Sequence, residues 1–181
     1  VLAVGDGVTK VKSGDEVILG WVKGEGLDAP GAKYMCGEQV INSGAVTTFS
    51  NYTVVSENRL VIKPASLSFD TAVLFGCALP TGAGMVLNEL KPVHNQSVIV
   101  LGLGGIGLAA LISLKALGVC SIIAIDISEE KLKLAKQLGA THTFNSMNKN
   151  FRRNVFDLTN GGADMCVESG GQVTTIELGF S

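Results

Sequence analysis

The sequence predicts an α/β protein in which a parallel, doubly wound sheet follows a smaller β-rich domain. From Ser97 onward, apolar strand-like runs alternate with helix-like segments, and tight glycine turns join them. This alternation is typical of a parallel sheet with helices on its faces. Residues 1–90 instead contain short β-type runs separated by turns. We therefore expect two domains, at residues 1–90 and 91–181.

The first domain is expected to consist of short strands followed by two helices. Its three strand-like runs are residues 16–20, 51–55 and 59–63. Beyond Pro64 the pattern becomes helical, and Ser68 can cap a helix over residues 69–75. A second helix is predicted over residues 82–90, because Pro92 stops it.

The second domain alternates buried strands with helices. Four strands are predicted, at residues 97–102, 121–126, 141–145 and 163–168. The first two are continuous apolar runs, as expected for strands covered on both faces. A helix that is apolar almost all round follows the first strand and ends at Gly118. Ser128 caps the next helix, which carries acids in its first turn and ends at Gly139.

Composition excludes two classes of function. The 181 residues carry a net charge of −2 and their Lys and Arg are scattered, so we expect no nucleic-acid partner. Residues 98–114 hold no charge, but they fall short of the roughly 20 residues that a membrane span needs. Four glycines also crowd the first half of that run, so we expect no membrane segment.

The cysteines show no metal-binding spacing of their own. Cys36, Cys77, Cys120 and Cys166 lie more than forty residues apart and form no Cys-x-x-Cys pair. Taken singly, each is expected to be a reduced thiol in a cytoplasmic protein.

A glycine-rich loop follows the first strand of the second domain. Gly102, Gly104 and Gly107 have the Gly-x-Gly-x-x-Gly spacing, and Gly105 and Ile106 lie between them. Inside a strand–loop–helix unit, this spacing predicts a dinucleotide site. Gly102 allows the tight turn, Gly104 lets the backbone approach a pyrophosphate, and Gly107 allows helix and strand to pack closely. The N–H groups at the helix start then face the anion.

Asp126 indicates which dinucleotide binds. It ends the second strand, about 20 residues after Gly107. A carboxylate there accepts both hydroxyls of the adenosine ribose and repels a 2′-phosphate, which favours NAD over NADP. Lys131 is within reach of the same ribose, although a solvated helix face explains that lysine equally well. The loop is followed by no Gly-Lys-[Ser/Thr], which excludes a P-loop, and its three-glycine spacing disfavours a methyltransferase.

Six segments, in order, carry a resemblance to a known family. They are GVTKVKSGDEVIL, TTFSNYTVV, LFGCALPTGAG, VIVLGLGGIGLAA, IIAIDISEEKLKLAKQLGATHTFN and GGADMCVESGG. Through them the chain resembles the zinc-dependent alcohol dehydrogenases of the medium-chain dehydrogenase/reductase superfamily. The resemblance implies that residues 1–90 are part of a GroES-like catalytic domain. It implies that residues 91–181 are an incomplete Rossmann domain.

The same resemblance implies roles for individual residues. Cys77 matches a ligand of catalytic zinc, and Thr81 matches the threonine packed beside the nicotinamide. The positions that match NAD-binding residues are Gly102, Gly104, Gly105, Ile106, Gly107, Asp126 and Lys131, with Ser169 and Gly170 on the adenine side. Zinc would polarise the alcohol oxygen so that hydride passes to NAD.

The chain departs from the family in three ways. It contains no Gly-His-Glu motif, and His94 and His142 do not replace the missing zinc ligands. Only Cys36 lies in the lobe around residues 21–43, where many relatives carry four cysteines, so we expect no structural zinc. Two strands of a complete Rossmann sheet are missing. We therefore expect a fragment that lacks both ends, is inactive by itself, and separates Cys77 from its zinc partners.

These observations predict an oxidoreductase that transfers hydride between an alcohol and NAD in the full-length parent. Its partners would be an alcohol, aldehyde or ketone substrate and further copies of the same chain. Two alternatives stay open: a zinc-free NADPH quinone or enoyl reductase of the same superfamily, and a nucleotide-binding protein without catalysis. Asp126 and Cys77 both argue against the reductase.

Overall fold

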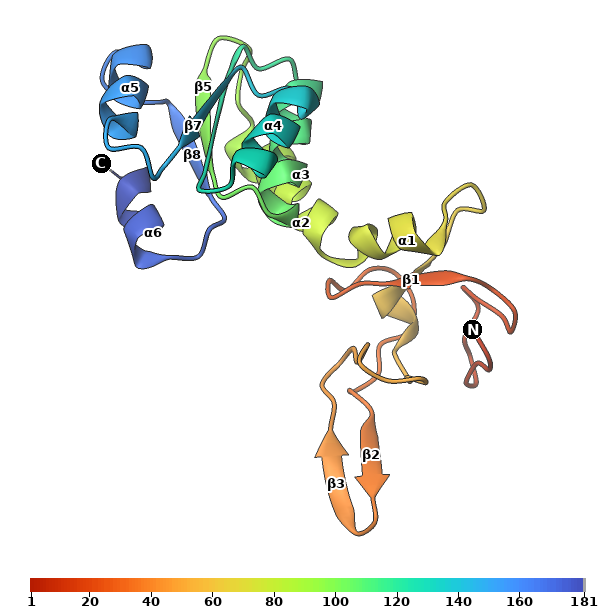
Figure 1. Cartoon of the computed structure of the whole chain (residues 1–181). Coiled ribbons are helices and arrows are strands. Elements are labelled where there is room, and N and C mark those ends of the chain that lie inside the picture. The colour runs from red at the N-terminus through yellow and green to blue at the C-terminus, as the bar shows by residue number, and fades with distance from the viewer. Residues whose placement is uncertain (181) are drawn as a thin grey trace. The chain divides into compact units, whose positions relative to one another are not determined.

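The computed structural model describes residues 1–180. The chain divides into two compact units, Val1–Cys77 and Ala78–Ser181. Figure 1 shows the first unit in red to yellow and the second in green to blue. The division falls earlier than the expected boundary after residue 90. The reason is that the helix α2 (Ala78–Gly84) packs against α3 (Gly105–Ala116) of the second unit. The expected assignments of the two domains stay predictions.

The first unit contains two small antiparallel sheets. Strand β1 (Val17–Leu19) pairs with β4 (Leu60–Ile62), inside two of the predicted runs. Strand β2 (Lys33–Cys36) pairs with β3 (Gln39–Asn42), a hairpin that the sequence analysis missed. Its signal is Gly37, which opens the two-residue turn with a φ of 59°, a conformation that favours glycine.

The strand predicted at residues 51–55 is wrong. In the described part of the chain this run forms no strand. The Val54 N–H donates to the Tyr34 hydroxyl at 2.9 Å, so its backbone bonds to a side chain rather than to a neighbouring strand. β-type composition therefore did not decide the local structure here.

A buried carboxylate ties the loops of the first unit together. Glu57 begins the short 3-10 helix η1 (Glu57–Arg59) and is 5% exposed. Its Oε1 accepts the N–H groups of Thr9 and Lys10, and its Oε2 accepts that of Leu27 at 2.7 Å. These backbone hydrogen bonds, with that from Leu27 the largest, lower the pKa of Glu57.

Two helical stretches follow, as the sequence predicts, but with different bounds. The first is α1 (Phe69–Ala72) continued by the 3-10 helix η2 (Val73–Gly76), and the Ser68 hydroxyl accepts the Thr71 N–H at its start. The second begins at Ala78 rather than Gly82, and α2 runs on into the π-helix η3 (Met85–Leu90). It ends where Lys91 adopts a left-handed conformation, directly before Pro92.

The second unit is built on a parallel four-stranded sheet of order β7-β6-β5-β8. The strands are β5 (Ser97–Leu101), β6 (Ser121–Asp126), β7 (His142–Asn145) and β8 (Met165–Glu168). Besides α3, its helices are α4 (Glu129–Leu138), α5 (Phe151–Leu158) and α6 (Val173–Gly179). The predicted doubly wound fold is confirmed.

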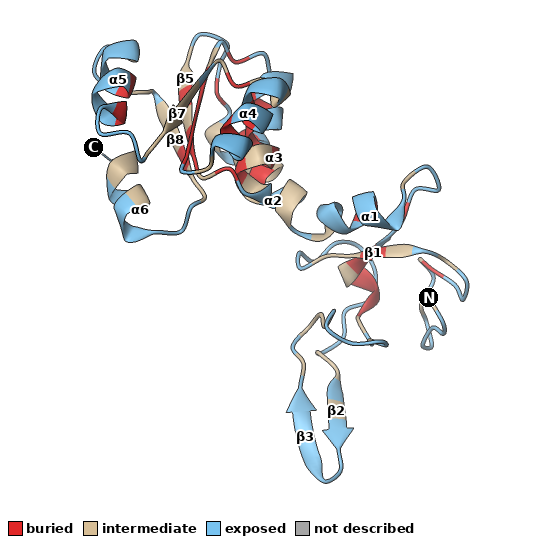
Figure 2. Ribbon diagram, in the orientation of Figure 1, coloured by how far each residue is buried: buried red, intermediate tan, exposed pale blue. Residues whose placement is uncertain are grey.

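Helices cover both faces of this sheet, and each face has its own core. Because successive strand residues point to opposite faces, Ile122 packs toward α3 and α4, whereas Ile123 packs toward α5. Figure 2 shows the buried residues of this unit concentrated in the central strands and in α3. Burial on both faces explains why β5 and β6 are uninterrupted apolar runs.

Within residues 1–180, no single helix is long and apolar enough to cross a membrane. Two consecutive helical stretches, Phe69–Gly76 and Ala78–Leu90, meet the length and hydropathy criteria only when taken together.

Candidate functional site

The glycine-rich loop lies where β5 passes into α3, at the carboxyl end of the sheet. Gly102 has a φ of 85°, and its N–H donates to the Ile125 carbonyl at 2.9 Å. A Cβ at this position would lie 2.7 Å from the Gly170 nitrogen. A glycine is therefore required here both by the backbone conformation and by the segment that packs against it.

Gly107 and Gly104 are needed for different reasons. A Cβ on Gly107 would overlap the Gly102 carbonyl oxygen and lie 2.7 Å from the Ser169 hydroxyl. A Cβ on Gly104, by contrast, would have no described atom within 4 Å beyond its own chain neighbours and helix backbone. Gly104 and its neighbour Gly105 are exposed, so bare backbone faces solvent at this point.

Gly104 also opens α3, and no side chain of the described residues caps that helix. The N–H groups of its first turn therefore remain available to an anion, which the positive end of the helix dipole favours. A twelve-residue helix behind a bare glycine loop fits a pyrophosphate.

Asp126 is buried at the carboxyl end of β6 and braces this loop. Its Oδ2 accepts the Leu103 N–H at 2.7 Å, and its Oδ1 accepts the Ser128 N–H at 2.9 Å. A carboxylate has about four acceptor positions, so further hydrogen bonds to ribose hydroxyls are within its capacity. Lys131 brings its Nζ to 4.0 Å from Asp126 Oδ2, and its side chain is about half exposed.

Ser169 and Gly170 lie at the end of β8, against the glycine loop. The Ser169 hydroxyl donates to the Gly102 carbonyl at 2.8 Å, so it ties the glycine loop to the end of β8. Gly170 packs on Gly102, and the Gly170 nitrogen occupies the space that a side chain at position 102 would need. The structure thus brings the predicted residues of this segment and of the loop together.

Glu168 is a residue that the sequence analysis missed. Its Oε1 accepts the N–H groups of Gly170 and Gly171 and the Thr175 hydroxyl, the last at 2.7 Å. The Thr175 hydrogen bond, with support from the two backbone groups, lowers the pKa of Glu168. Its signal in the sequence is a carboxylate at the carboxyl end of a parallel strand, the same position that Asp126 occupies on β6.

Cys77 and Thr81 lie at the junction between η2 and α2. Cys77 directly precedes α2, Thr81 belongs to that helix, and both are exposed. Among residues 1–180, no three His, Cys, Asp or Glu side chains come together in a group that could hold a metal ion. A catalytic zinc needs three protein ligands, so the donor set around Cys77 does not fit zinc by itself.

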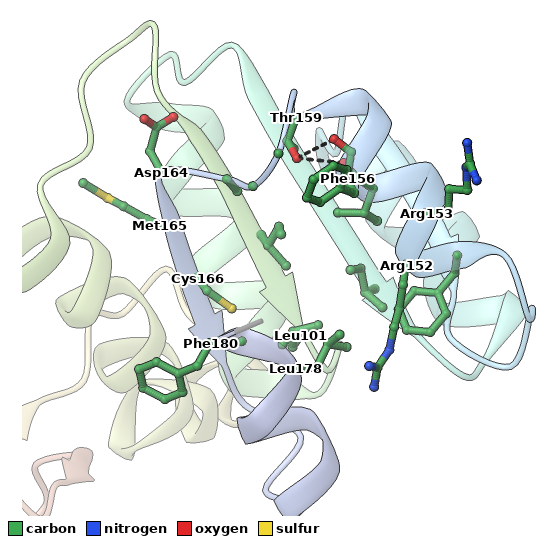
Figure 3. Close-up of a pocket in the computed structure, with 18 of the residues that line it drawn as sticks. Leu101, Arg152, Arg153, Phe156, Thr159, Asp164, Met165, Cys166, Leu178 and Phe180 are labelled. Atoms are coloured by element: carbon green, nitrogen blue, oxygen red, sulfur yellow. Dashed lines mark hydrogen bonds between the residues drawn. The ribbon is translucent and has the colours of Figure 1, made fainter.

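A separate cavity of about 770 Å³ lies on the sheet face that α5 and α6 flank. Figure 3 shows Leu101, Cys166 and Leu178 among the side chains that line it. Burial, followed by the charge of Glu168, raises the pKa of the Cys166 thiol to about 11. None of the predicted site residues lines this cavity, whose walls include Arg152, Arg153 and Asp164 as well as apolar side chains.

Comparison with known proteins shows which families and structures the chain is similar to. Residues 105–181 match the zinc-binding dehydrogenase family. The whole chain is similar to the benzyl alcohol dehydrogenase of Acinetobacter calcoaceticus, with 31% identity and a TM-score of 0.79 over 98% of this chain and 54% of that one. The chain is related to the zinc-type alcohol dehydrogenases of the medium-chain dehydrogenase/reductase superfamily. The resemblance drawn from its motifs is confirmed.

Two further solved structures resemble this dehydrogenase-like chain. An alcohol dehydrogenase zinc-binding domain protein of Burkholderia ambifaria has 25% identity and a TM-score of 0.80, over 98% of this chain and 55% of that one. The alcohol dehydrogenase of Aeropyrum pernix has 27% identity and a TM-score of 0.77, over 96% and 53%. The chain therefore spans about half the length of the solved structures that it matches.

Proposed function

We propose that this chain supplies the NAD-binding part of an oxidoreductase that transfers hydride between an alcohol and NAD. The observation that carries the proposal is the buried carboxylate of Asp126, held beside the glycine loop by the Leu103 N–H. A fixed negative charge at this point accepts ribose hydroxyls and repels a 2′-phosphate. The relationship to alcohol dehydrogenases supports the reaction class.

Each part of the site has a distinct task in this proposal. The backbone of Gly104, Gly105 and Ile106 receives the pyrophosphate at the start of α3. Asp126 and Lys131 bind the adenosine ribose, and Ser169 with Gly170 shapes the adenine side. Ser169 also fixes the loop through its hydrogen bond to Gly102. When bound, NAD would supply a nicotinamide ring as the hydride acceptor.

Thr81 and Cys77 are assigned by resemblance alone. We propose that Thr81 packs beside the nicotinamide and that Cys77 is one ligand of a catalytic zinc. The described residues form no group of three His, Cys, Asp or Glu side chains that could hold a metal ion, so no zinc-dependent step is assigned to them. A cytoplasmic location and self-association also belong to this proposal, as does a small alcohol, aldehyde or ketone as substrate.

Titration with NADH and NADPH tests the proposal. We expect NADH to bind at least about tenfold more tightly, since a 2′-phosphate would meet the Asp126 carboxylate. Asp126→Asn keeps an acceptor oxygen for the Leu103 N–H and removes the charge, at the cost of the hydrogen bond from the Ser128 N–H. The variant should therefore lose most of the discrimination. Nicotinamide fluorescence reports both dissociation constants.

Asp157→Asn is the matched control, because Asp157 is an exposed carboxylate on α5 whose partner is Arg153. It should leave both dissociation constants unchanged. Tighter binding of NADPH by the unaltered protein would contradict the proposal and favour the zinc-free reductase. Loss of all nucleotide binding in the unaltered, folded protein would contradict it as well.

A further inference from the structure

A cysteine and a histidine meet at the amino end of the central strands. Cys120 directly precedes β6, and His94 lies in the turn before β5. The Cys120 Sγ is 3.0 Å from the His94 Nε2, and the Cys120 N–H donates to the His94 carbonyl at 3.0 Å. Two contacts thus join the same pair of residues, so the segments that lead into β5 and β6 hold thiol and imidazole together.

The Gly118 carbonyl fixes the tautomer of the imidazole. The His94 Nδ1 lies 2.5 Å from that oxygen, and because a carbonyl only accepts, Nδ1 carries the proton. Nε2 is then the unprotonated nitrogen, and it is the one nearer to the Cys120 Sγ, which lies 3.0 Å from Nε2 and 3.7 Å from Nδ1 and so packs over the ring face. Gly118 has a φ of 74°, a conformation that favours glycine and that sets the direction of its carbonyl. A thiol, an unprotonated ring nitrogen and a group that fixes the tautomer therefore lie together, which are the parts that an activated thiol uses.

We propose that Cys120 and His94 form a reactive thiol site that is modified by small disulfides. As the Cys120 Sγ attacks one sulfur of the disulfide, His94 Nε2 takes the thiol proton. A new S–S bond forms on Cys120, the original S–S bond breaks, and the second sulfur leaves with the electron pair as a thiolate, which then regains a proton. Cys120 is oxidised and the leaving sulfur is reduced, so the incoming disulfide supplies the oxidant.

Cys120 differs from Cys166 in its exposure to solvent, and it differs from Cys36 in its contact with a histidine. Both Cys120 and His94 are exposed, so a small disulfide reaches the pair without local unfolding. Cys166 is only partly accessible, and burial raises its pKa to about 11, which leaves little thiolate for attack. Cys36 is exposed like Cys120, but it lies on the hairpin of the first unit. Its reaction rate therefore serves as the internal reference for an exposed cysteine that is not in contact with a histidine.

Site-resolved kinetics test the proposal. The folded protein is incubated with glutathione disulfide, quenched with acid, alkylated and digested, and mass spectrometry follows the occupancy of each cysteine peptide with time. We expect Cys120 to be modified about tenfold or more faster than Cys36, because a positioned base assists its attack. In urea, where the pair is separated, the two rates should become equal.

His94→Gln should lower the Cys120 rate to that of Cys36. The matched control is His142→Gln, since the His142 Nδ1 contacts the Thr141 hydroxyl and not a cysteine. That variant should react like the unaltered protein. Equal rates at Cys120 and Cys36 in the folded protein would overturn the proposal, and so would a fast Cys120 that is unaffected by His94→Gln. The comparison in urea needs no variant and so holds even if a substitution disturbs folding.

Discussion

At the scale of single residues, the loop glycines differ in whether the fold requires them, although the Gly-x-Gly-x-x-Gly pattern treats them alike. Gly107 is fixed by packing, because the Gly102 carbonyl and the Ser169 hydroxyl occupy the space of a side chain. Gly104 is free of such contacts with the described residues and has a φ of −79°, which any residue adopts. The fold therefore does not require a glycine here, whereas the proposed approach of a pyrophosphate would.

This difference predicts that one substitution affects stability and the other affects NADH binding. Gly107→Ala should lower the free energy of unfolding by about 2 kcal/mol, because backbone must move to admit the methyl group. Gly104→Ala should change it by less than about 1 kcal/mol, the scale of an N-cap replacement, yet weaken NADH binding about tenfold or more. Urea denaturation and NADH titration measure the two quantities. Unchanged NADH affinity in Gly104→Ala would rule out close approach of the pyrophosphate there.

Single residues also show where sequence reasoning stops. The spacing singled out Gly102 and Asp126, since one directly follows an apolar strand and the other ends one. It did not reveal that Asp126 bonds to the Leu103 N–H, or that the Ser169 hydroxyl reaches Gly102. Those hydrogen bonds join separate strands, so they depend on which strands are neighbours in the sheet. Glu168 was missed for a related reason, because its partners follow from the turn after β8.

At the scale of elements, predictability followed burial. β5 and β6 were located closely, because strands covered on both faces must be apolar throughout. The hairpin β2–β3 is exposed along nearly its whole length, so no buried face imposed an alternating pattern on its sequence. The run at residues 51–55 had strand-like composition but no neighbouring strand to bond with. A long-range hydrogen bond from Val54 to Tyr34 decided its conformation instead.

The packing of α2 on α3 gives a prediction at this scale. A Cβ on Gly82 would overlap the Ile106 carbonyl and lie 2.8 Å from the Ala109 Cβ. Gly82→Ala should therefore push the helices apart and lower the free energy of unfolding by about 2 kcal/mol. Two residues on, Gly84 has helical backbone angles, and its nearest described neighbour is an Asn88 side-chain nitrogen at 3.6 Å.

Gly84→Ala should accordingly raise the free energy of unfolding by about 0.5–1 kcal/mol, through the higher helix propensity of alanine. The same change in the same helix thus has opposite signs, and denaturant unfolding of both variants measures it. Equal destabilisation by the two substitutions would show that helix α2 is not held by close contact at Gly82.

At the scale of the whole molecule, the two units are stabilised in different ways, and the boundary between them does not fall where the sequence pattern changes. Both apolar core clusters of the sheet are formed by residues from Val86 onward, inside the second unit. The first unit instead relies on short strands and on the Glu57 carboxylate, which gathers three backbone N–H groups. The sequence placed the domain boundary after residue 90 because Pro92 ends a helix there. Packing assigns that helix to the later unit, and packing partners are not visible in a local pattern.

This arrangement predicts that residues 78–181 fold without the first unit. They contain all four strands of the parallel sheet, the helices on both of its faces and every residue proposed to contact NAD. A shortened chain of these residues should unfold in one cooperative transition and bind NADH as tightly as the whole chain does. Residues 1–77 should bind none. Circular dichroism in urea and NADH titration provide the measurements. If the shortened chain folds cooperatively but loses NADH affinity, the first unit contributes to the nucleotide site. If it shows no cooperative transition, the sheet depends on the first unit for its stability.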